Sequence, residues 1–208
     1  NSGGPLVDSQ GRIIGVNSAI ATLGATATSN GNIGLGFSIP FNQAKRIANE
    51  LIAKANAKTT LEKVKVLHHW VAQNIRYLGI YVGAGGFVPH DAQSILDNLY
   101  GDCKDHVVIL ESLLAAAGID SSPALINSST AYLLPKLPTP GIFDHVITYV
   151  PSLNVFLDST SRFAPLGTLP SGDMDKPVVL TQTGALSRTP QTDPNKDRTE
   201  ARIQMRLT

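Results

Sequence analysis

The 208-residue sequence predicts a loop-rich protein of mixed helices and strands that falls into two parts. Residues 5–40 are rich in Gly, Ser, Thr, Ile and Val, a composition typical of strands joined by turns. Residues 41–53 and 60–76 instead carry apolar side chains at the three- and four-residue spacing of amphipathic helices. The composition changes between residues 54 and 59, and all five histidines follow that point. We therefore place a boundary after residue 54.

The composition excludes several classes of protein. The chain has 17 Lys and Arg against 16 Asp and Glu, which argues against binding nucleic acid through a generally basic surface. With 42% hydrophobic residues it is too apolar for a disordered protein. No apolar run approaches the ~20 residues of a membrane-spanning helix. The single cysteine excludes an internal disulfide, and the start at Asn1, without Met or a signal segment, suggests a piece of a longer protein.

Three strands and a helix are expected in the first part. Two strands, 6–7 and 12–20, flank a turn that ends in Gly11, and a third strand follows at 35–39. Pro40 then opens the first helix. The apolar face of this helix consists of Ala44, Ile47, Ala48, Leu51 and Ile52.

The second part is expected to contain three helices followed by short strands. The helix at 60–76 has a core-facing side made of Leu61, Val64, Leu67, Trp70, Val71 and Ile75. A short helix is predicted at 91–99 and a longer one at 103–117, which Gly118 ends. Strands are predicted at 122–127, 145–150, 154–158 and finally 200–207.

Cys103 falls where a polar turn becomes a helix, because apolar side chains at helical spacing begin at Val107. The free N–H groups and the dipole at a helix start favour an anion, so they stabilise a thiolate, which is the nucleophilic form of cysteine. Asp102 and Asp105 suit the same dipole. Lys104 is expected to point to solvent or to pair with one of these two carboxylates.

A base and an orienting acid for such a thiol are present further along the chain. His145 begins one predicted strand and Asp158 ends the next, so an antiparallel hairpin would bring the two side chains together. A helix packed across that hairpin would direct Cys103 toward His145. The residues alone leave two interpretations open, a Cys103–His145–Asp158 site or a buried thiol with unrelated polar residues.

Seven segments within residues 59–186 resemble the bacterial form of the transglutaminase-like superfamily core. They are Ile75-Arg76-Tyr77, Pro89 with Asp91-Ala92, Tyr100-Gly101-Asp102-Cys103-Lys104-Asp105, Ala116-Ala117-Gly118-Ile119, Phe143-Asp144-His145-Val146, Leu157-Asp158-Ser159-Thr160 and Gly167-Thr168-Leu169-Pro170. The resemblance implies a papain-like α+β fold, in which the helix bearing the cysteine packs on an antiparallel sheet, for a domain over 55–190. It further implies Cys103 as nucleophile, His145 as general base and acid, and Asp158 as the acid that orients the imidazole.

Residues 1–53 resemble a different family, the trypsin-like serine proteases of the HtrA type. The resemblance rests on Asn1-Ser2-Gly3-Gly4-Pro5-Leu6-Val7, Gly11-Arg12-Ile13-Ile14-Gly15-Val16-Asn17 and Gly34-Leu35-Gly36-Phe37-Ser38-Ile39-Pro40. It implies that residues 1–54 are a truncated β-barrel segment with the helix that follows, and that Ser2 occupies the nucleophile position. The His and Asp of that family's triad lie earlier in the chain, so Ser2 is expected to be vestigial, because a hydroxyl without a base is a weak nucleophile.

The remaining candidate residues are expected to have supporting roles. His68 and His69 are adjacent on a helix and cannot form an i, i+4 metal pair, so we expect solvated or capping side chains. His90 and His106 are expected to be polar neighbours of the site, and Trp70 to belong to the core. No zinc-spaced set, phosphate-binding glycine loop or calcium site is visible in the sequence, so no metal and no cofactor are predicted.

These observations lead to one expected function and two alternatives. The first is thiol-dependent acyl transfer or hydrolysis at peptide or protein amides by Cys103, His145 and Asp158. The alternatives are an HtrA-type serine endopeptidase fragment with Ser2 as nucleophile, inactive alone, and a non-catalytic peptide-binding module. The expected partner is a peptide or protein substrate, and a periplasmic or secreted bacterial setting follows from the resemblances only. A further β segment is predicted to start within 191–208.

Overall fold

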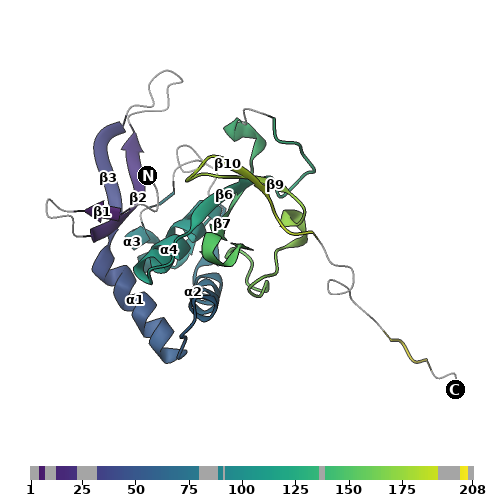
Figure 1. The fold of residues 1–208 in the computed structure, drawn as a ribbon, viewed down its shortest axis with the longest axis horizontal. Helices are drawn as coiled ribbons and strands as arrows, with labels where there is room; N and C mark the ends of the chain where they lie inside the picture. The colour runs from purple at the N-terminus through teal and green to yellow at the C-terminus, as the bar shows by residue number, and fades with distance from the viewer. Residues whose placement is uncertain are drawn as a thin grey trace.

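The computed structural model describes residues 5–7, 13–22, 32–79, 89–90, 92–135, 139–191 and 202–205, with side chains from Asn42 onward (Figure 1). Ser2 lies outside the described residues. The strand predicted at 200–207 is not found at residues 202–205, which belong to no helix or strand. The start of a further β segment within 191–208 stays a prediction. Within the described residues, no helix is long and apolar enough to cross a membrane.

The first part of the chain forms a three-stranded antiparallel sheet. Strand β2 (Ile13–Thr22) lies between β1 (Pro5–Val7) and β3 (Asn32–Pro40), as the sequence predicted to within a few residues. Helix α1 (Phe41–Lys54) follows β3 without a break. This sheet lies at one side of the molecule, next to α1 (Figure 1).

Three further helices follow, and the last of them is central to the molecule. They are α2 (Thr60–Asn74), α3 (Ala92–Asn98) and α4 (Cys103–Ala116). Helix α4 packs against α1, α2, α3 and the sheet strand β7 (Figure 1), so every residue from Asp105 to Leu114 is buried. This burial on all sides explains why its sequence is apolar beyond a single face.

The second sheet has five antiparallel strands in the order β10-β9-β6-β7-β8. Its central strands are β6 (Ser122–Ile126) and β7 (His145–Val150), and β8 (Val155–Leu157) forms one edge. Strands β9 (Pro177–Leu180) and β10 (Ala185–Arg188) form the other side and were not predicted from the sequence. A two-residue parallel pair, β4 (Arg76–Tyr77) with β5 (Tyr100–Gly101), lies just before α4.

Two apolar clusters cover the two faces of this sheet. The larger joins the helices to the sheet and includes Ala44, Ala48, Leu67, Leu110, Leu114, Val150 and Leu157. The smaller lies beneath the other face and consists of Ala124, Ile126, Ile147, Phe156, Leu169 and Val178. The predicted core face of α2 is confirmed at Val64, Leu67, Val71 and Ile75, but Leu61 is 52% exposed because it lies in the first turn, beyond the cluster.

Candidate active site

The start of α4 is fixed by a reciprocal pair of caps. Asp102 is the N-cap, and its side chain accepts the N–H of Lys104 at 3.2 Å. The N–H of Asp102 in turn donates to Asp105 Oδ2 at 3.0 Å. Both carboxylates lie where the helix dipole is positive, which stabilises this end of the helix. Cys103 is the first residue of α4 and is half-buried, so it lies beside the N–H groups at the helix start that have no partner within the helix.

The neighbours of Asp105 connect this helix start to the preceding segment. The N–H of His90 donates to Asp105 Oδ1 at 2.7 Å, and His90 Nδ1 lies 2.9 Å from Oδ2. The Lys104 ammonium pairs with Asp102, one of the two arrangements expected from the sequence. His90 is thus a polar neighbour of the helix start, and it ties residues 89–90 to α4.

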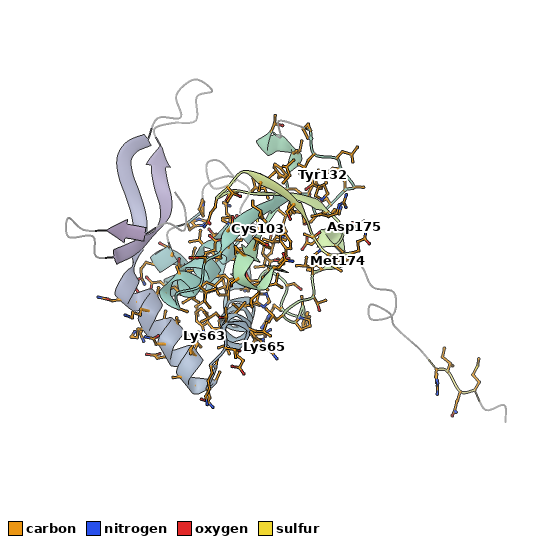
Figure 2. The ribbon with its side chains drawn as sticks, viewed as in Figure 1. Lys63, Lys65, Cys103, Tyr132, Met174 and Asp175 are labelled. Carbon is orange, nitrogen blue, oxygen red and sulfur yellow. The ribbon has the colours of Figure 1, made fainter. Side chains whose placement is uncertain are left out.

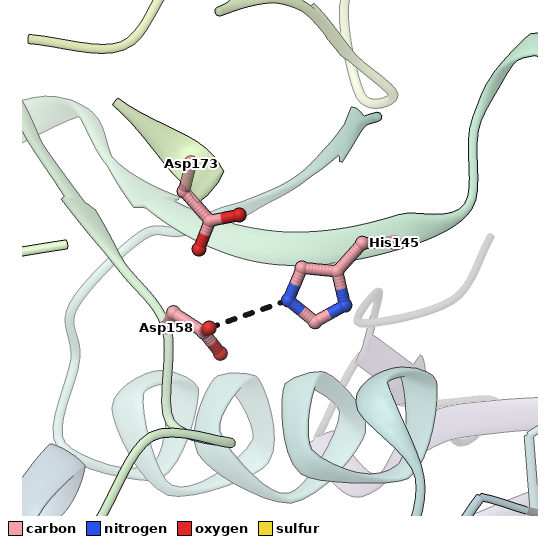
Figure 3. A group of neighbouring side chains, drawn as sticks. All are labelled: His145, Asp158 and Asp173. Atoms are coloured by element: carbon pink, nitrogen blue, oxygen red, sulfur yellow. Dashed lines mark hydrogen bonds and ion pairs between the residues drawn. The ribbon is translucent and has the colours of Figure 1, made fainter. Parts of the chain in front are cut away.

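His145 and Asp158 come together through the pairing of β7 with β8. Thr148 lies opposite Leu157 in this pair, and one further step of the register places Asp158 opposite Ile147, a diagonal neighbour of His145. Diagonal residues of a pair share one sheet face and are within reach of a long side chain. His145 Nε2 lies 3.3 Å from Asp158 Oδ2 (Figure 3). The hairpin predicted from the sequence therefore brings the side chains of His145 and Asp158 together, as expected.

The other oxygen of Asp158 is held separately. Asp158 Oδ1 accepts the N–H of Thr160 at 2.9 Å and the hydroxyl of Thr160 at 2.6 Å. Burial alone would raise the pKa of Asp158, but His145 and Thr160 outweigh it and lower this pKa. Burial likewise lowers the pKa of His145, and the hydrogen bonds and charges of Asp158 and Cys103 more than reverse the effect and raise it. The surroundings thus favour an imidazolium beside a carboxylate.

The effect of Cys103 on the pKa of His145 indicates that the cysteine lies near the imidazole. Cys103 is one of the groups that raise the pKa of His145. Cys103 is the first residue of α4, and α4 packs against β7 of the five-stranded sheet (Figure 2). Nε2 of His145 is directed at Asp158, so Nδ1 is the ring nitrogen that this pair does not engage.

Asp173 is a third polar residue at this place, and sequence reasoning missed it. It is 1% exposed, its Oδ1 accepts a hydrogen bond from the Ser128 hydroxyl, and its Oδ2 has no partner among the described residues. Ligand atoms of His145, Asp158 and Asp173 all lie within 4.8 Å of one another (Figure 3). Burial and the charge of Asp158 raise the pKa of Asp173 to about 6, against the effects of Ser128 and His145.

Two buried histidines hold the backbone that carries Asp158. His106 Nδ1 lies 2.9 Å from the carbonyl oxygen of Ser159, and His68 hydrogen-bonds with the backbone of Asp158. Burial lowers the pKa of both rings, against the effects of these backbone contacts. The expectation of a solvated or capping His68 was wrong, since it is 3% exposed and lies on the buried face of α2, whereas His69 is exposed.

Comparison with known proteins gives two separate similarities. Residues 45–125 match the sequence model of the Transglutaminase-like superfamily. A solved structure described as a candidate protease from Parabacteroides distasonis superposes with a TM-score of 0.54 at 18% identity, covering 73% of this chain and 28% of that one. This likeness shows the fold alone. The α+β class with a papain-like core, in which the cysteine-bearing helix packs on an antiparallel sheet, is therefore confirmed.

The second similarity is to serine proteases and is short. Serine protease PepD of Mycobacterium tuberculosis is 59% identical over 59 residues, which are 27% of this chain and 13% of that protein. Periplasmic serine endoprotease DegP of Escherichia coli is 41% identical over 58 residues, or 28% of this chain and 11% of that protein. Both family resemblances found in the sequence are thus confirmed, and the chain spans only about a tenth of these serine proteases.

Proposed function

We propose that this chain is a thiol-dependent enzyme that acts at peptide or protein amide bonds by acyl transfer or hydrolysis. Cys103 serves as nucleophile, His145 as general base and acid, and Asp158 as the residue that orients the imidazole. The observation that carries the proposal is the 3.3 Å pair of His145 and Asp158 at the capped start of the helix that begins with Cys103. The match of residues 45–125 to the transglutaminase-like superfamily supports it.

The proposed reaction follows from the placement of these groups. With the proton of the thiol held on Nδ1 of His145, the Cys103 thiolate attacks the carbonyl carbon of the amide. The N–H of Cys103, at the helix start, donates to the oxygen that becomes negative. The C–N bond then breaks, the imidazolium protonates the leaving amine, and a thioester remains on Cys103. Water or a second amine resolves the thioester, with His145 again removing the proton of the attacking group.

Asp158 fixes which ring nitrogen faces the sulfur. Its hydrogen bond to Nε2 leaves Nδ1 for the thiol, and its charge stabilises the imidazolium that forms during attack. Thr160, His68 and His106 act on Asp158 rather than on substrate, because they hold its carboxylate or the backbone around it.

The single cysteine makes the proposal directly testable by alkylation. Iodoacetamide should label Cys103 near neutral pH faster than it labels free cysteine, and His145→Ala should remove the difference. His69→Ala is the matched control, because His69 is exposed on α2. Labelling no faster than free cysteine, or equal rates in the His145 variant and the parent chain, would contradict the proposal.

Turnover separates hydrolysis from transfer. Fluorescently labelled casein reports peptide-bond cleavage, and incorporation of a fluorescent primary amine into casein reports transamidation. Cys103→Ala should abolish whichever activity is found, and His145→Ala should reduce it by about 10²–10⁴-fold, the range for losing a general acid–base. Amide turnover that survives Cys103→Ala would rule out this nucleophile.

A second candidate function rests on the short serine protease similarity. Ser2, in the segment that resembles the HtrA type, would then be the nucleophile of a serine endopeptidase fragment. A fluorophosphonate probe labels an activated serine, so labelling that disappears in Ser2→Ala would favour this function. Labelling that Ser2→Ala leaves unchanged, or no labelling of the parent chain, would contradict it.

A further inference from the structure

We propose that His145, Asp158 and Asp173 form a binding site for one divalent transition-metal cation of the Zn²⁺ class, and that occupancy of this site inactivates Cys103. The binding itself is independent of the proposed function. Only its inhibitory consequence rests on that function.

The donor atoms have the spacing that such an ion needs. Ligand atoms of the three residues lie within 4.8 Å of one another (Figure 3). An ion lies about 2.0–2.2 Å from each donor atom, so binding would bring these donor atoms closer to one another than they are now. Only a small movement of the three side chains toward the ion is needed. One imidazole nitrogen and two carboxylate oxygens suit Zn²⁺, whereas Ca²⁺ and Mg²⁺ prefer sites made of oxygen alone.

Each carboxylate is anchored through one oxygen and directs the other inward. Asp158 uses Oδ1 to accept two hydrogen bonds from Thr160, and Asp173 uses Oδ1 to accept the hydroxyl of Ser128. The Oδ2 atom of Asp158 faces His145, and the Oδ2 atom of Asp173 is unpartnered in the described part of the chain. Carboxylates that bind a metal are usually held in this way by hydrogen bonds from outer-shell groups, here Thr160 and Ser128.

The anchor of Asp173 is itself held in place. The N–H of Ser128 donates to Asp144 Oδ1 at 2.7 Å, and Asp144 directly precedes His145. Gly172 lies so close to this loop that a Cβ atom there would be 2.8 Å from the carbonyl oxygen of Ser128. The segments before His145, around Ser128 and before Asp173 therefore form one support for two of the three ligands.

The site has two buried carboxylates and only one imidazole to pair with them. Asp158 and Asp173 are 4% and 1% exposed, and Asp173 Oδ2 has no hydrogen-bond partner among the described residues. An unsatisfied buried carboxylate is costly, and His145 can satisfy only one of the two. A cation bound by all three residues would partner both carboxylates. A proton shared by the two carboxylates would do the same, so the experiment must exclude it.

Binding of the ion would remove the base that Cys103 needs. A metal at Nε2 displaces the hydrogen bond to Asp158 and requires that Nε2 carries no proton. The neutral ring then keeps its proton on Nδ1, which is the nitrogen that faces the thiol. His145 can no longer accept the Cys103 proton, so the thiol stays protonated and unreactive.

The test is calorimetric titration of Zn²⁺ at pH 7.5, with Co²⁺ absorption to identify the ligands. Cys103→Ala should bind like the parent chain, and the cobalt-loaded parent chain should show no thiolate-to-cobalt charge-transfer band. Asp173→Asn should weaken binding by about 100-fold, and Ser128→Ala by about 10-fold as the loss of an outer support. Asp175→Asn, a half-exposed neighbour paired with Arg188, is the matched control and should bind normally.

Three outcomes would overturn the proposal. These are no Zn²⁺ binding, equal binding by Asp173→Asn, or binding lost in Cys103→Ala, which would place the ion on the thiol and imidazole. Thermal unfolding shows whether each variant is folded. If Asp173→Asn does not fold, Ser128→Ala provides the test of the metal site. The proposed function is judged separately. Zn²⁺ should slow iodoacetamide labelling of Cys103 in the parent chain but not in Ser128→Ala at the same subsaturating concentration, while binding without amide turnover would refute the function alone.

Discussion

Glu111 is a buried carboxyl on α4 that the proposed chemistry does not use. It is 4% exposed, and its Oε1 has no hydrogen-bond partner among the described residues. Burial raises the pKa of Glu111 to about 8. The folded protein therefore holds a proton on Glu111 at pH values where the unfolded chain, with an ordinary glutamate, has released it.

This difference gives Glu111 a defined effect on stability. The contribution of the protonated Glu111 to the free energy of unfolding is complete at pH values below the pKa of glutamate in the unfolded chain. It is lost as the pH rises through the pKa of Glu111 in the folded protein, near 8, at about 1.4 kcal/mol per pKa unit. Glu111→Gln should therefore flatten the fall in unfolding free energy between pH 5 and pH 8, measured by urea denaturation. Glu50→Gln, at an exposed position on α1, should leave it unchanged. Parallel pH curves for Glu111→Gln and the parent chain would refute the assignment.

The residues of the candidate site differ in how far the sequence could reveal them. Cys103, His145 and Asp158 each stand at an end of a predicted element, so their proximity followed from a hairpin and a helix. Asp173 is positioned by a turn and by Ser128, and no periodic spacing links it to the others. His68 did have a signal, because it follows Val64 by four residues on the buried face of α2.

At the scale of elements, the start of α4 depends on a close approach that only glycine allows. A Cβ atom on Gly101 would lie 2.4 Å from Cβ of Asp105. Asp105 cannot move freely, because it caps Asp102 and binds both the N–H and the ring of His90. Any side chain at residue 101 must therefore displace this cap or the strand pair β4–β5 beside it.

Gly101→Ala should accordingly lower the free energy of unfolding by about 1–3 kcal/mol, the usual range for overpacking. Chemical denaturation measures the change. Gly141→Ala is the control, because nothing lies within 4 Å of a Cβ atom there, and a surface change of this kind stays within about 0.5 kcal/mol. Equal effects of the two substitutions would mean that the contact with Asp105 is easily relieved.

The elements themselves were predictable where the local pattern is strong. The four helices and strands β6, β7 and β8 follow from periodicity and caps, as at Thr59, which forms a capping box with Glu62. The hairpin of β9 and β10 was missed. β9 is four residues long, begins with Pro177 and pairs with β6 at only two positions, so its place depends on the sheet rather than on its own sequence.

At the scale of the whole molecule, α1 joins the two parts that the sequence separates. The change of composition places a boundary after residue 54, so that α1 goes with the strands before it. Its buried residues Ala44 and Ala48 nevertheless belong to the main cluster, and α1 packs on α4. The transglutaminase-like match also begins at residue 45, inside this helix. We infer that the folding unit begins at α1.

Two shortened chains test this boundary. A chain that starts at Phe41 keeps α1 and should unfold cooperatively, with only a modest loss from the missing contacts of β2 and β3 with α1. A chain that starts at Ala55 exposes the surface of α4 that Ala44 and Ala48 cover, together with contacts of Ile47 and Leu51. Fully burying one Leu or Ile side chain contributes about 1.5–3 kcal/mol, and the partly buried Ile47 and Leu51 together with the two alanines contribute several kcal/mol, so this chain should melt at least about 10 °C lower. Thermal unfolding followed by circular dichroism measures both, and equal melting temperatures would return the boundary to residue 54.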